Sequence, residues 1–176
     1  MLAILKKLRR RLAAGERISR AELIEILDGL IGEPESTGSR SGVLYADGGS
    51  RGNPGPAAYG AALFDADGGE LARRAARIGR ATNNVAEYRG LLAGLELARE
   101  LGLSELTVRL DSQLVVRQMT GRYKAKNAAL RELRDKAREL AAGFQRVSYQ
   151  HIPREANRLA DALANAALDG RDPEGV

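Results

Sequence analysis

Four acidic residues stand at the borders of predicted strands and helices, where side chains from distant parts of a chain can meet. Asp47 and Asp111 are each expected at the end of a strand, while Glu87 and Asp161 fall in the first two turns of two helices. Carboxylates that converge raise one another's pKa unless a cation neutralises them. Convergence would therefore indicate a metal site. For any one acid alone, the alternative is a surface cap or an ion-pair partner.

The type of ligand narrows the choice of metal. The candidate ligands are all oxygens, and the chain contains no cysteine. Oxygen ligands suit Mg²⁺ or Mn²⁺ rather than zinc. Three or four carboxylates can hold two such ions roughly 3.5–4 Å apart, one activating a water and the other stabilising the leaving oxygen of an in-line phosphoryl displacement. We therefore expect two ions, Mg²⁺ or Mn²⁺, in the active complex, and nuclease chemistry.

The elements that would position these acids follow from the hydrophobic pattern. Two β-prone runs, Val43–Ala46 and Ala57–Phe64, are joined by a Gly- and Pro-rich segment, and Glu70–Ile78 makes a third, so an antiparallel meander is expected. Later strands separated by helices require parallel, right-handed crossovers. The sequence therefore predicts an α/β fold with a mixed sheet flanked by helices. The later elements are predicted as helix Asn84–Leu101, strand Leu106–Leu110, helices Ser112–Met119 and Ala128–Ala142, strand Phe144–His151 and helix Ala156–Leu168.

The N-terminal region reads as a separate, basic appendage. Leucines at helical spacing from Leu2 to Leu12, and the capping-box pair Ser19 and Glu22, predict a short helical hairpin. The 176 residues suffice for one ordinary domain plus such an extension. The expected organisation is a hairpin at residues 1–32, a linker at 33–42, a catalytic domain at 43–170 and a tail at 171–176.

Charge and composition exclude several classes of protein. The net charge of +5 equals the contribution of Lys6, Lys7, Arg9, Arg10 and Arg11, so the rest of the chain is balanced. This pattern favours a short basic segment attached to an electrically neutral domain over a protein whose whole surface binds nucleic acid. No apolar run has the roughly 20 residues of a membrane-spanning helix, and no signal peptide is evident. A soluble, cytoplasmic protein without membrane partners is therefore expected.

Four segments resemble, in order, the signature segments of type 1 ribonuclease H, and the resemblance covers residues 43 to about 169. The segments are Asp47–Pro56 (DGGSRGNPGP), Thr82–Glu87 (TNNVAE), Leu110–Val115 (LDSQLV) and His151–Asp161 (HIPREANRLAD). The resemblance implies a ribonuclease H-like fold with a five-stranded mixed sheet. It also implies hydrolysis of the RNA strand of RNA/DNA hybrids, leaving 5′-phosphate ends. The metal-binding catalytic positions would be Asp47, Glu87, Asp111 and Asp161.

Residues near these acids are candidates for contacts with an RNA/DNA hybrid. Gly48 and Gly49 would let the backbone approach a nucleic-acid strand, and side-chain amides can read minor-groove edges and 2′-hydroxyls. The resemblance assigns a DNA-phosphate contact to Thr82. Helix N-capping is the alternative for Thr82 and Ser112, and also for either asparagine of the 83–84 pair. The amide candidates are Asn53, Asn83, Asn84 and Gln113.

The chain departs from the best-studied bacterial members of the family at two places. Many members carry a histidine before the last carboxylate that assists catalysis, and His151 is the candidate for this auxiliary role, with a structural strand-end histidine as the alternative. The segment before Asp161 lacks the glycine-rich loop that holds such a histidine in those bacterial members, which favours the structural alternative. No basic protrusion fits between Met119 and Leu130. Arg122, Lys124 and Lys126 remain there as candidate phosphate contacts, with a solvated turn as the alternative.

Two rival functions stay open at this point. A binding module could retain the fold without turnover, and a domain of this type could belong to a reverse transcriptase or act on another nucleic acid. The hairpin could contact nucleic acid, in which case binding would weaken steeply with salt, or it could pack on the domain or on a second copy of the chain.

Overall fold

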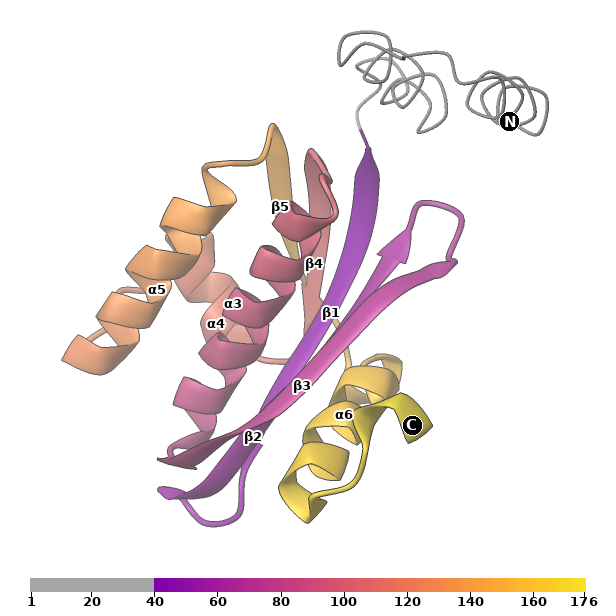
Figure 1. The fold of residues 1–176 in the computed structure, drawn as a ribbon. Coiled ribbons are helices and arrows are strands. Elements are labelled where there is room, and N and C mark those ends of the chain that lie inside the picture. Colours follow the sequence, from indigo (N-terminus) through magenta and orange to yellow (C-terminus); the bar gives the residue numbers. More distant parts are fainter. Residues whose placement is uncertain (1–39) are drawn as a thin grey trace, which may run out of the picture. The chain divides into compact units, whose positions relative to one another are not determined.

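The computed structural model describes residues 40–176, and its centre is a mixed sheet (Figure 1). The order across the sheet is β3-β2-β1-β4-β5. The first three strands pair antiparallel as a meander, while β4 pairs parallel with β1 and with β5. The predicted fold class, a five-stranded mixed sheet flanked by helices, is therefore confirmed. The strands are β1 (Ser41–Ser50), β2 (Gly55–Asp65), β3 (Glu70–Ala81), β4 (Glu105–Leu110) and β5 (Arg146–His151).

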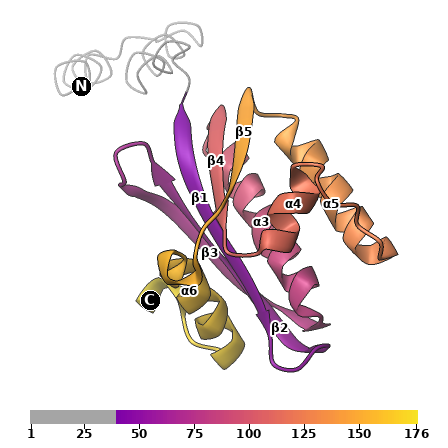
Figure 2. The same ribbon diagram turned by 180° about the vertical axis from the view of Figure 1, so that it is seen from behind.

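Helices cover both faces of the sheet, as Figures 1 and 2 show. One face carries three of them, and the long helix among these packs on β1 and β2. The opposite face carries a single helix, α6, which packs on β1, β2 and β3. The helices are α3 (Asn83–Glu100), α4 (Gln113–Met119), α5 (Ala128–Ala141) and α6 (Arg158–Asp169), with 3₁₀ turns η1 (Arg154–Ala156) and η2 (Pro173–Gly175).

The main core lies between the sheet and α3. Alternate residues of β1 and β4, such as Leu44 and Val108, are fully buried and meet Leu91 and Leu95 of the helix. Burying an aliphatic side chain contributes about 1.5–3 kcal/mol, so this layer holds the strands and α3 in fixed relative positions. The carboxyl end of β4, the middle of β1 and the start of α3 are therefore held by one packed unit.

The first strand is longer than the sequence predicted. Asp47 was expected to end it, but β1 continues to Ser50, which pairs with Ala57 of β2. That prediction is wrong because ladder pairing with β2 overrides the low strand propensity of Gly48 and Gly49. The Gly- and Pro-rich connection shrinks to residues 51–54, closed by the Arg51 N–H, which donates to the Pro56 carbonyl at 2.8 Å.

The other predicted elements are found with small shifts at their ends. The strand predicted from Phe144 begins at Arg146, and the last helix begins at Arg158 because residues 154–156 form the 3₁₀ turn η1. The predicted hairpin at residues 1–32 and most of the linker at 33–42 lie outside the described residues, so the domain organisation stays a prediction. Within residues 40–176, no helix is long and apolar enough to cross a membrane.

Candidate active site

Three of the predicted carboxylates meet at one place. One oxygen each of Asp47, Glu87 and Asp111 lies within 4.8 Å of the other two. Asp47 is on β1, Glu87 is in the second turn of α3, and Asp111 directly follows β4. Asp47 and Glu87 are 7% and 8% exposed, whereas Asp111 is half-buried. Within the described part of the chain, this is the group of acids with the spacing to hold a metal ion.

The contact between β1 and α3 explains why Asp47 and Glu87 are neighbours. A Cβ atom on Gly48 would lie 2.2 Å from the backbone N of Glu87 and 2.0 Å from the carbonyl carbon of Ala86. A Cβ atom on Gly90 would lie 2.6 Å from the carbonyl oxygen of Asp47. Real Cβ atoms do not approach so closely, so glycine on each element lets the two backbones touch.

The parallel pairing of β1 with β4 brings in Asp111. This ladder ends with Tyr45 opposite Arg109, and Asp47 and Asp111 each follow two residues later, with carboxylate oxygens within 4.8 Å of each other. Asp111 is the first residue after β4, at the carboxyl end of the strand. Polar groups gather at such strand ends because the following loop leaves their side chains uncovered by the core.

Burial and mutual repulsion make this cluster costly in its ionised form. Burial, together with the charges of Asp111 and Asp161, raises the pKa of Asp47 to about 7. Burial, together with repulsion from Asp47 and Asp111, raises the pKa of Glu87 to about 9. A nearby cation reverses both effects, because it favours the ionised form.

The donor set fits a divalent ion. The Oε2 atom of Glu87 is buried and has no hydrogen-bond partner among the described residues, although buried polar atoms are normally paired. Its Oε1 accepts only a long hydrogen bond from Asn83, at 3.4 Å. An unpaired buried carboxylate oxygen beside two further carboxylates is the environment that an oxygen-coordinated cation such as Mg²⁺ or Mn²⁺ would satisfy.

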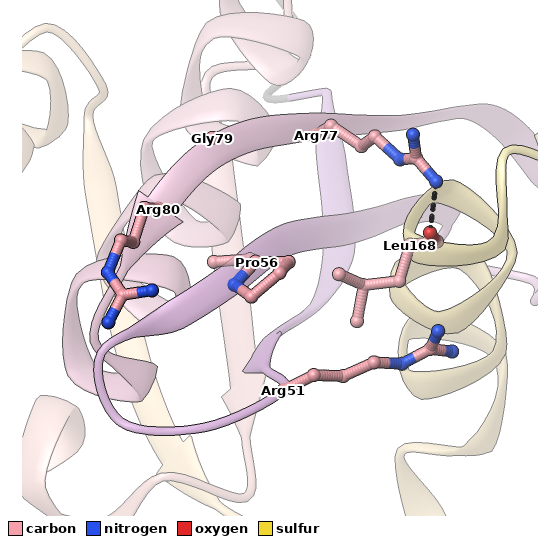
Figure 3. A pocket seen from close by; sticks show the side chains of 7 residues that line it. Arg51, Pro56, Arg77, Gly79, Arg80 and Leu168 are labelled. Carbon is pink, nitrogen blue, oxygen red and sulfur yellow. Dashed lines mark hydrogen bonds between the residues drawn. The ribbon is translucent and has the colours of Figure 1, made fainter.

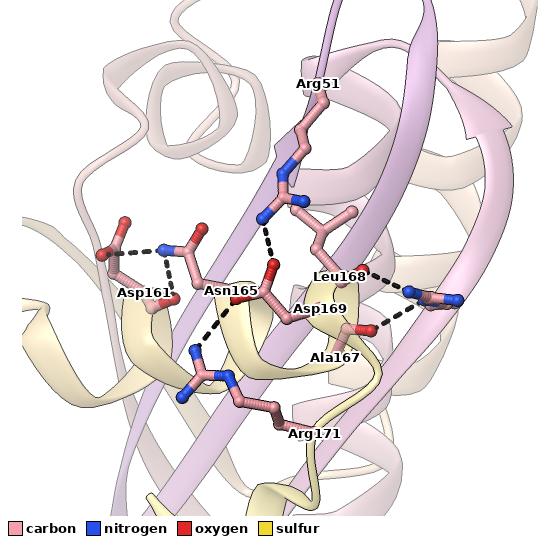
Figure 4. Close-up of polar contacts among 8 residues, drawn as sticks. Arg51, Asp161, Asn165, Ala167, Leu168, Asp169 and Arg171 are labelled. Atoms are coloured by element: carbon pink, nitrogen blue, oxygen red, sulfur yellow. Dashed lines mark hydrogen bonds and ion pairs between the residues drawn. The ribbon is translucent and has the colours of Figure 1, made fainter.

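The fourth predicted acid, Asp161, lies beside this group but outside it. It sits in the first turn of α6, and its charge raises the pKa of Asp47. Its Oδ1 accepts a hydrogen bond from the Arg154 guanidinium at 2.7 Å. Its Oδ2 accepts one from Asn165 at 3.1 Å, which Figure 4 shows. Asp161 therefore interacts with Asp47 through its charge, while hydrogen bonds from Arg154 and Asn165 hold its two oxygens.

Two residues of the site were missed by sequence reasoning. Arg154, in η1, carries the positive charge that lowers the pKa of both Asp47 and Glu87. Asn157, between η1 and α6, donates a hydrogen bond to Asp111 at 2.8 Å. Both lie inside the segment His151–Asp161 that carries the family resemblance, so their place in that motif was the available signal.

The predicted substrate contacts lie close to the start of α3. The Thr82 hydroxyl accepts from the Val85 N–H at 3.4 Å, so Thr82 is the N-cap, and the capping alternative for the two asparagines after it is wrong. The Asn53 Oδ1 accepts from the Asn83 N–H at 3.2 Å, which ties the β1–β2 turn to this helix end. Asn84 is half-buried in the same turn of the helix.

The remaining candidates surround the acids on other elements. Ser112 stands at the N-cap position of α4 without a capping hydrogen bond from its side chain, and Gln113 begins that helix. His151 ends β5, is exposed, and pairs with Leu110, the residue before Asp111. Gly49 has open space around it, unlike Gly48. The roles of all these residues toward a substrate stay predictions.

Apart from the carboxylate cluster, a cavity lies where the β1–β2 turn, β3 and the end of α6 meet (Figure 3). This cavity of about 650 Å³ is lined by three arginines. Arg51 pairs with Asp169, and Arg77 donates to the carbonyls of Ala167 and Leu168 (Figure 4). These two arginines therefore join the turn and β3 to the last turn of α6. The guanidinium of the third arginine, Arg80, makes no hydrogen bond or ion pair within residues 40–176.

Comparison with known proteins defines the class first. Residues 45–167 match the family model described as "Reverse transcriptase-like". The bifunctional protein Rv2228c of Mycobacterium tuberculosis is 56% identical over 128 residues, which are 72% of this chain and 35% of the relative. The chain thus corresponds to about a third of that longer protein.

Two solved structures identify the family within this class. RNase H1 from the archaeon Halobacterium salinarum has 51% identity and a TM-score of 0.73, covering 74% of this chain and 98% of that one. LC11-RNase H1, solved in complex with an RNA/DNA hybrid, has 42% identity and a TM-score of 0.70, covering 73% and 97%. The chain belongs to the type 1 ribonuclease H family.

Proposed function

We propose that this protein is a metal-dependent endonuclease that hydrolyses the RNA strand of RNA/DNA hybrids. The observation that carries the proposal is the meeting of Asp47, Glu87 and Asp111, with a buried, unpaired oxygen on Glu87. The family membership supports it, since a relative of 42% identity binds an RNA/DNA hybrid. The named archaeal relative supports the ribonuclease H activity itself.

The four acids would share the work of holding two divalent ions. Asp47 has oxygens of Glu87 and Asp111 within 4.8 Å and interacts electrostatically with Asp161, so it would contact both ions, with Glu87 and Asp111 helping to hold one and Asp161 the other. When bound, the ions lower the pKa of water and neutralise charge that develops on the phosphate. An ion beside Asp161 would compete with Arg154 for the Oδ1 atom of this carboxylate. Without metal, Arg154 would offset part of the negative charge at Asp161.

Recognition of the hybrid would use the polar groups around this cage. Amides of Asn53, Asn83 and Asn84 lie at the junction of the β1–β2 turn and α3, and Gln113 begins α4. Amide donors and acceptors suit 2′-hydroxyls and minor-groove edges, which distinguish RNA from DNA. Residues 43–170 would form the catalytic domain. The hairpin at residues 1–32 would add a nucleic-acid contact or a site of self-association.

A comparison of substrates tests the proposal. The protein is incubated with an RNA/DNA hybrid, double-stranded RNA, and a DNA duplex with a single embedded ribonucleotide, each in Mg²⁺, in Mn²⁺ and in chelator. We expect cleavage of the RNA strand of the hybrid with either metal and none in chelator. Binding of the hybrid without cleavage in either metal would show a binding module instead. Preference for another duplex would reassign the substrate.

A further inference from the structure

We infer that Asn157 is a positioning residue, which fixes the Asp111 carboxylate and the start of α6 in the arrangement that binds divalent ions. The inference rests on the proposed function, since it concerns how the acids of that site are held. It goes further because it assigns a role to a residue that contributes no ligand of its own.

The side chain of Asn157 joins two strands of the site. It is 1% exposed, and its Nδ2 donates to the Ala46 carbonyl at 2.9 Å and to the Asp111 Oδ1 at 2.8 Å. Ala46 immediately precedes Asp47 on β1, and Asp111 follows β4. One amide group therefore ties the backbone beside one predicted ligand to the side chain of another. Its two hydrogens account for both of these bonds.

The backbone of the same residue sets the first turn of α6. The Asn157 N–H donates to the Arg154 carbonyl at 2.9 Å, and the Asn157 carbonyl accepts from the Asp161 N–H at 3.1 Å. Arg154 in turn holds the Asp161 side chain. Asn157 thus contacts, through its side chain or backbone, the segments that carry Asp47, Asp111 and Asp161.

The chemistry of the amide shows which of its groups is used. The Asn157 Oδ1 is buried and has no partner among the described residues, whereas both donors are satisfied. A buried acceptor without a partner is destabilising, so stability alone would not favour asparagine at this position. Its donor end meets a carbonyl and a carboxylate, and a carboxylate or an apolar side chain here would leave both oxygens without a donor.

The hydrogen bond from the Asn157 amide to the Asp111 Oδ1 restrains rotation of the Asp111 carboxylate even without a bound ion. Groups that orient metal ligands in this way typically change metal affinity or activity by about 10–100-fold when they are removed. The same loss would not follow from a purely structural asparagine, because such a residue lowers stability without changing metal binding by the folded protein.

The test measures metal binding directly in the full chain. Mn²⁺ is titrated calorimetrically, without substrate, into wild type, Asn157→Ala and Asn157→Ser, and hybrid cleavage is followed against Mg²⁺ concentration. For the alanine variant we expect about 10–100-fold weaker Mn²⁺ binding, a matching rise in the Mg²⁺ concentration for half-maximal rate, and an unchanged KM for the hybrid. The serine variant keeps one hydrogen-bond donor, so its Mn²⁺ affinity should lie between those of wild type and the alanine variant. If the alanine variant does not fold, the serine variant tests the inference.

Tyr88→Phe is the matched control. The Tyr88 hydroxyl donates to the Gln118 Oε1 at 2.7 Å in the buried core, so its removal also breaks a buried hydrogen bond but touches none of the four acids. It should lower the Tm and leave Mn²⁺ binding unchanged. Asn157 variants that lower the Tm yet bind Mn²⁺ like wild type would overturn the inference. A wild type that neither binds Mn²⁺ nor cuts the hybrid would instead overturn the proposed function.

Discussion

Glu87 is a residue whose burial is unfavourable for folding and whose carboxylate the proposed chemistry requires. The side chain is buried in the second turn of α3, one oxygen lacks a partner among the described residues, and its pKa is raised to about 9. In the unfolded chain a glutamate ionises near pH 4.3. The metal-free folded protein therefore retains a proton here over a wide pH range in which the unfolded chain has lost it.

This difference predicts a pH-dependent stability that a substitution removes. Because the folded pKa values of Asp47 and Glu87 lie above their unfolded values, unfolding of the metal-free protein releases protons, and stability falls as pH rises from about 5 towards 9. Glu87→Gln should match wild type near pH 5 and exceed it by about 1–4 kcal/mol at pH 9, at about 1.4 kcal/mol per pKa unit with relaxation of the site. Thermal denaturation in chelator at pH 5, 7 and 9 measures this.

Added Mg²⁺ supplies the control for this prediction. It should raise the Tm of wild type at pH 8 and leave Glu87→Gln nearly unchanged, because an ion that binds only the folded state stabilises it. A wild-type Tm in chelator that does not fall between pH 5 and pH 9 would contradict the raised pKa values.

The sequence could indicate the acids but not the residues that support them. Acids at strand and helix borders form a pattern, and three of them do converge. Apart from their place in the His151–Asp161 segment, a single arginine and a single asparagine form no such pattern, so the contacts of Arg154 with Asp161 and of Asn157 with Asp111 became visible only in the fold. Asp161 was predicted with the other acids, and its contact with Arg154 depends on side-chain geometry that sequence spacing does not encode.

At the scale of elements, the closest contact in the site is between β1 and α3. The absence of a side chain at Gly48 lets the helix approach the strand, and this approach brings Glu87 to Asp47. The next residue, Gly49, has nothing within 4 Å of a would-be Cβ. The two neighbouring glycines therefore differ in what they contribute.

The pair gives a matched prediction. Gly48→Ala forces a methyl group into the helix backbone and should cost about 1–3 kcal/mol or more, as overpacked cores do. It should also weaken Mg²⁺ binding, because Glu87 moves away from Asp47. Gly49→Ala should keep wild-type stability within about 0.5 kcal/mol. Urea denaturation compares them, and equal stabilities of the two variants would show that the close approach is unimportant.

Element types followed from the sequence more reliably than element ends. Periodicity and short connections sufficed for the meander and the crossovers, and every predicted element from Val43 onward is present. The end of β1 was misjudged because glycine lowers strand propensity locally while pairing with β2 is a long-range effect. The sequence left the N-cap of α3 undecided between Thr82 and the two asparagines after it. The structure shows that Thr82 is the N-cap, because its side chain accepts the hydrogen bond from the Val85 N–H.

At the scale of the whole molecule, the described residues contain the complete set of predicted acids. The sheet and its helices assemble the site from β1, α3, the end of β4 and α6. Arg40 belongs to this part as well, because its carbonyl accepts from the Ser104 N–H at 2.9 Å and from the Glu105 N–H at 3.2 Å.

Removal of residues 1–39 should therefore leave the chemistry intact. This deletion keeps Arg40 and removes the five basic residues between positions 6 and 11. We expect kcat at saturating hybrid to stay within about twofold of wild type, while KM rises and its dependence on salt weakens if the hairpin contacts phosphates. Steady-state kinetics at two salt concentrations measure both. A large loss of kcat would place the hairpin in the active site.

In the proposed function, the carboxylates that meet at Asp47 hold the divalent ions that RNA cleavage requires. The most direct measurement is cleavage of an end-labelled RNA strand in an RNA/DNA hybrid by wild type and by Asp47→Asn in Mg²⁺, with binding of the same hybrid measured in parallel. We predict that wild type cuts the RNA only when Mg²⁺ is present, and that Asp47→Asn binds the hybrid but scarcely cuts it. Full activity of Asp47→Asn in Mg²⁺ would contradict the account.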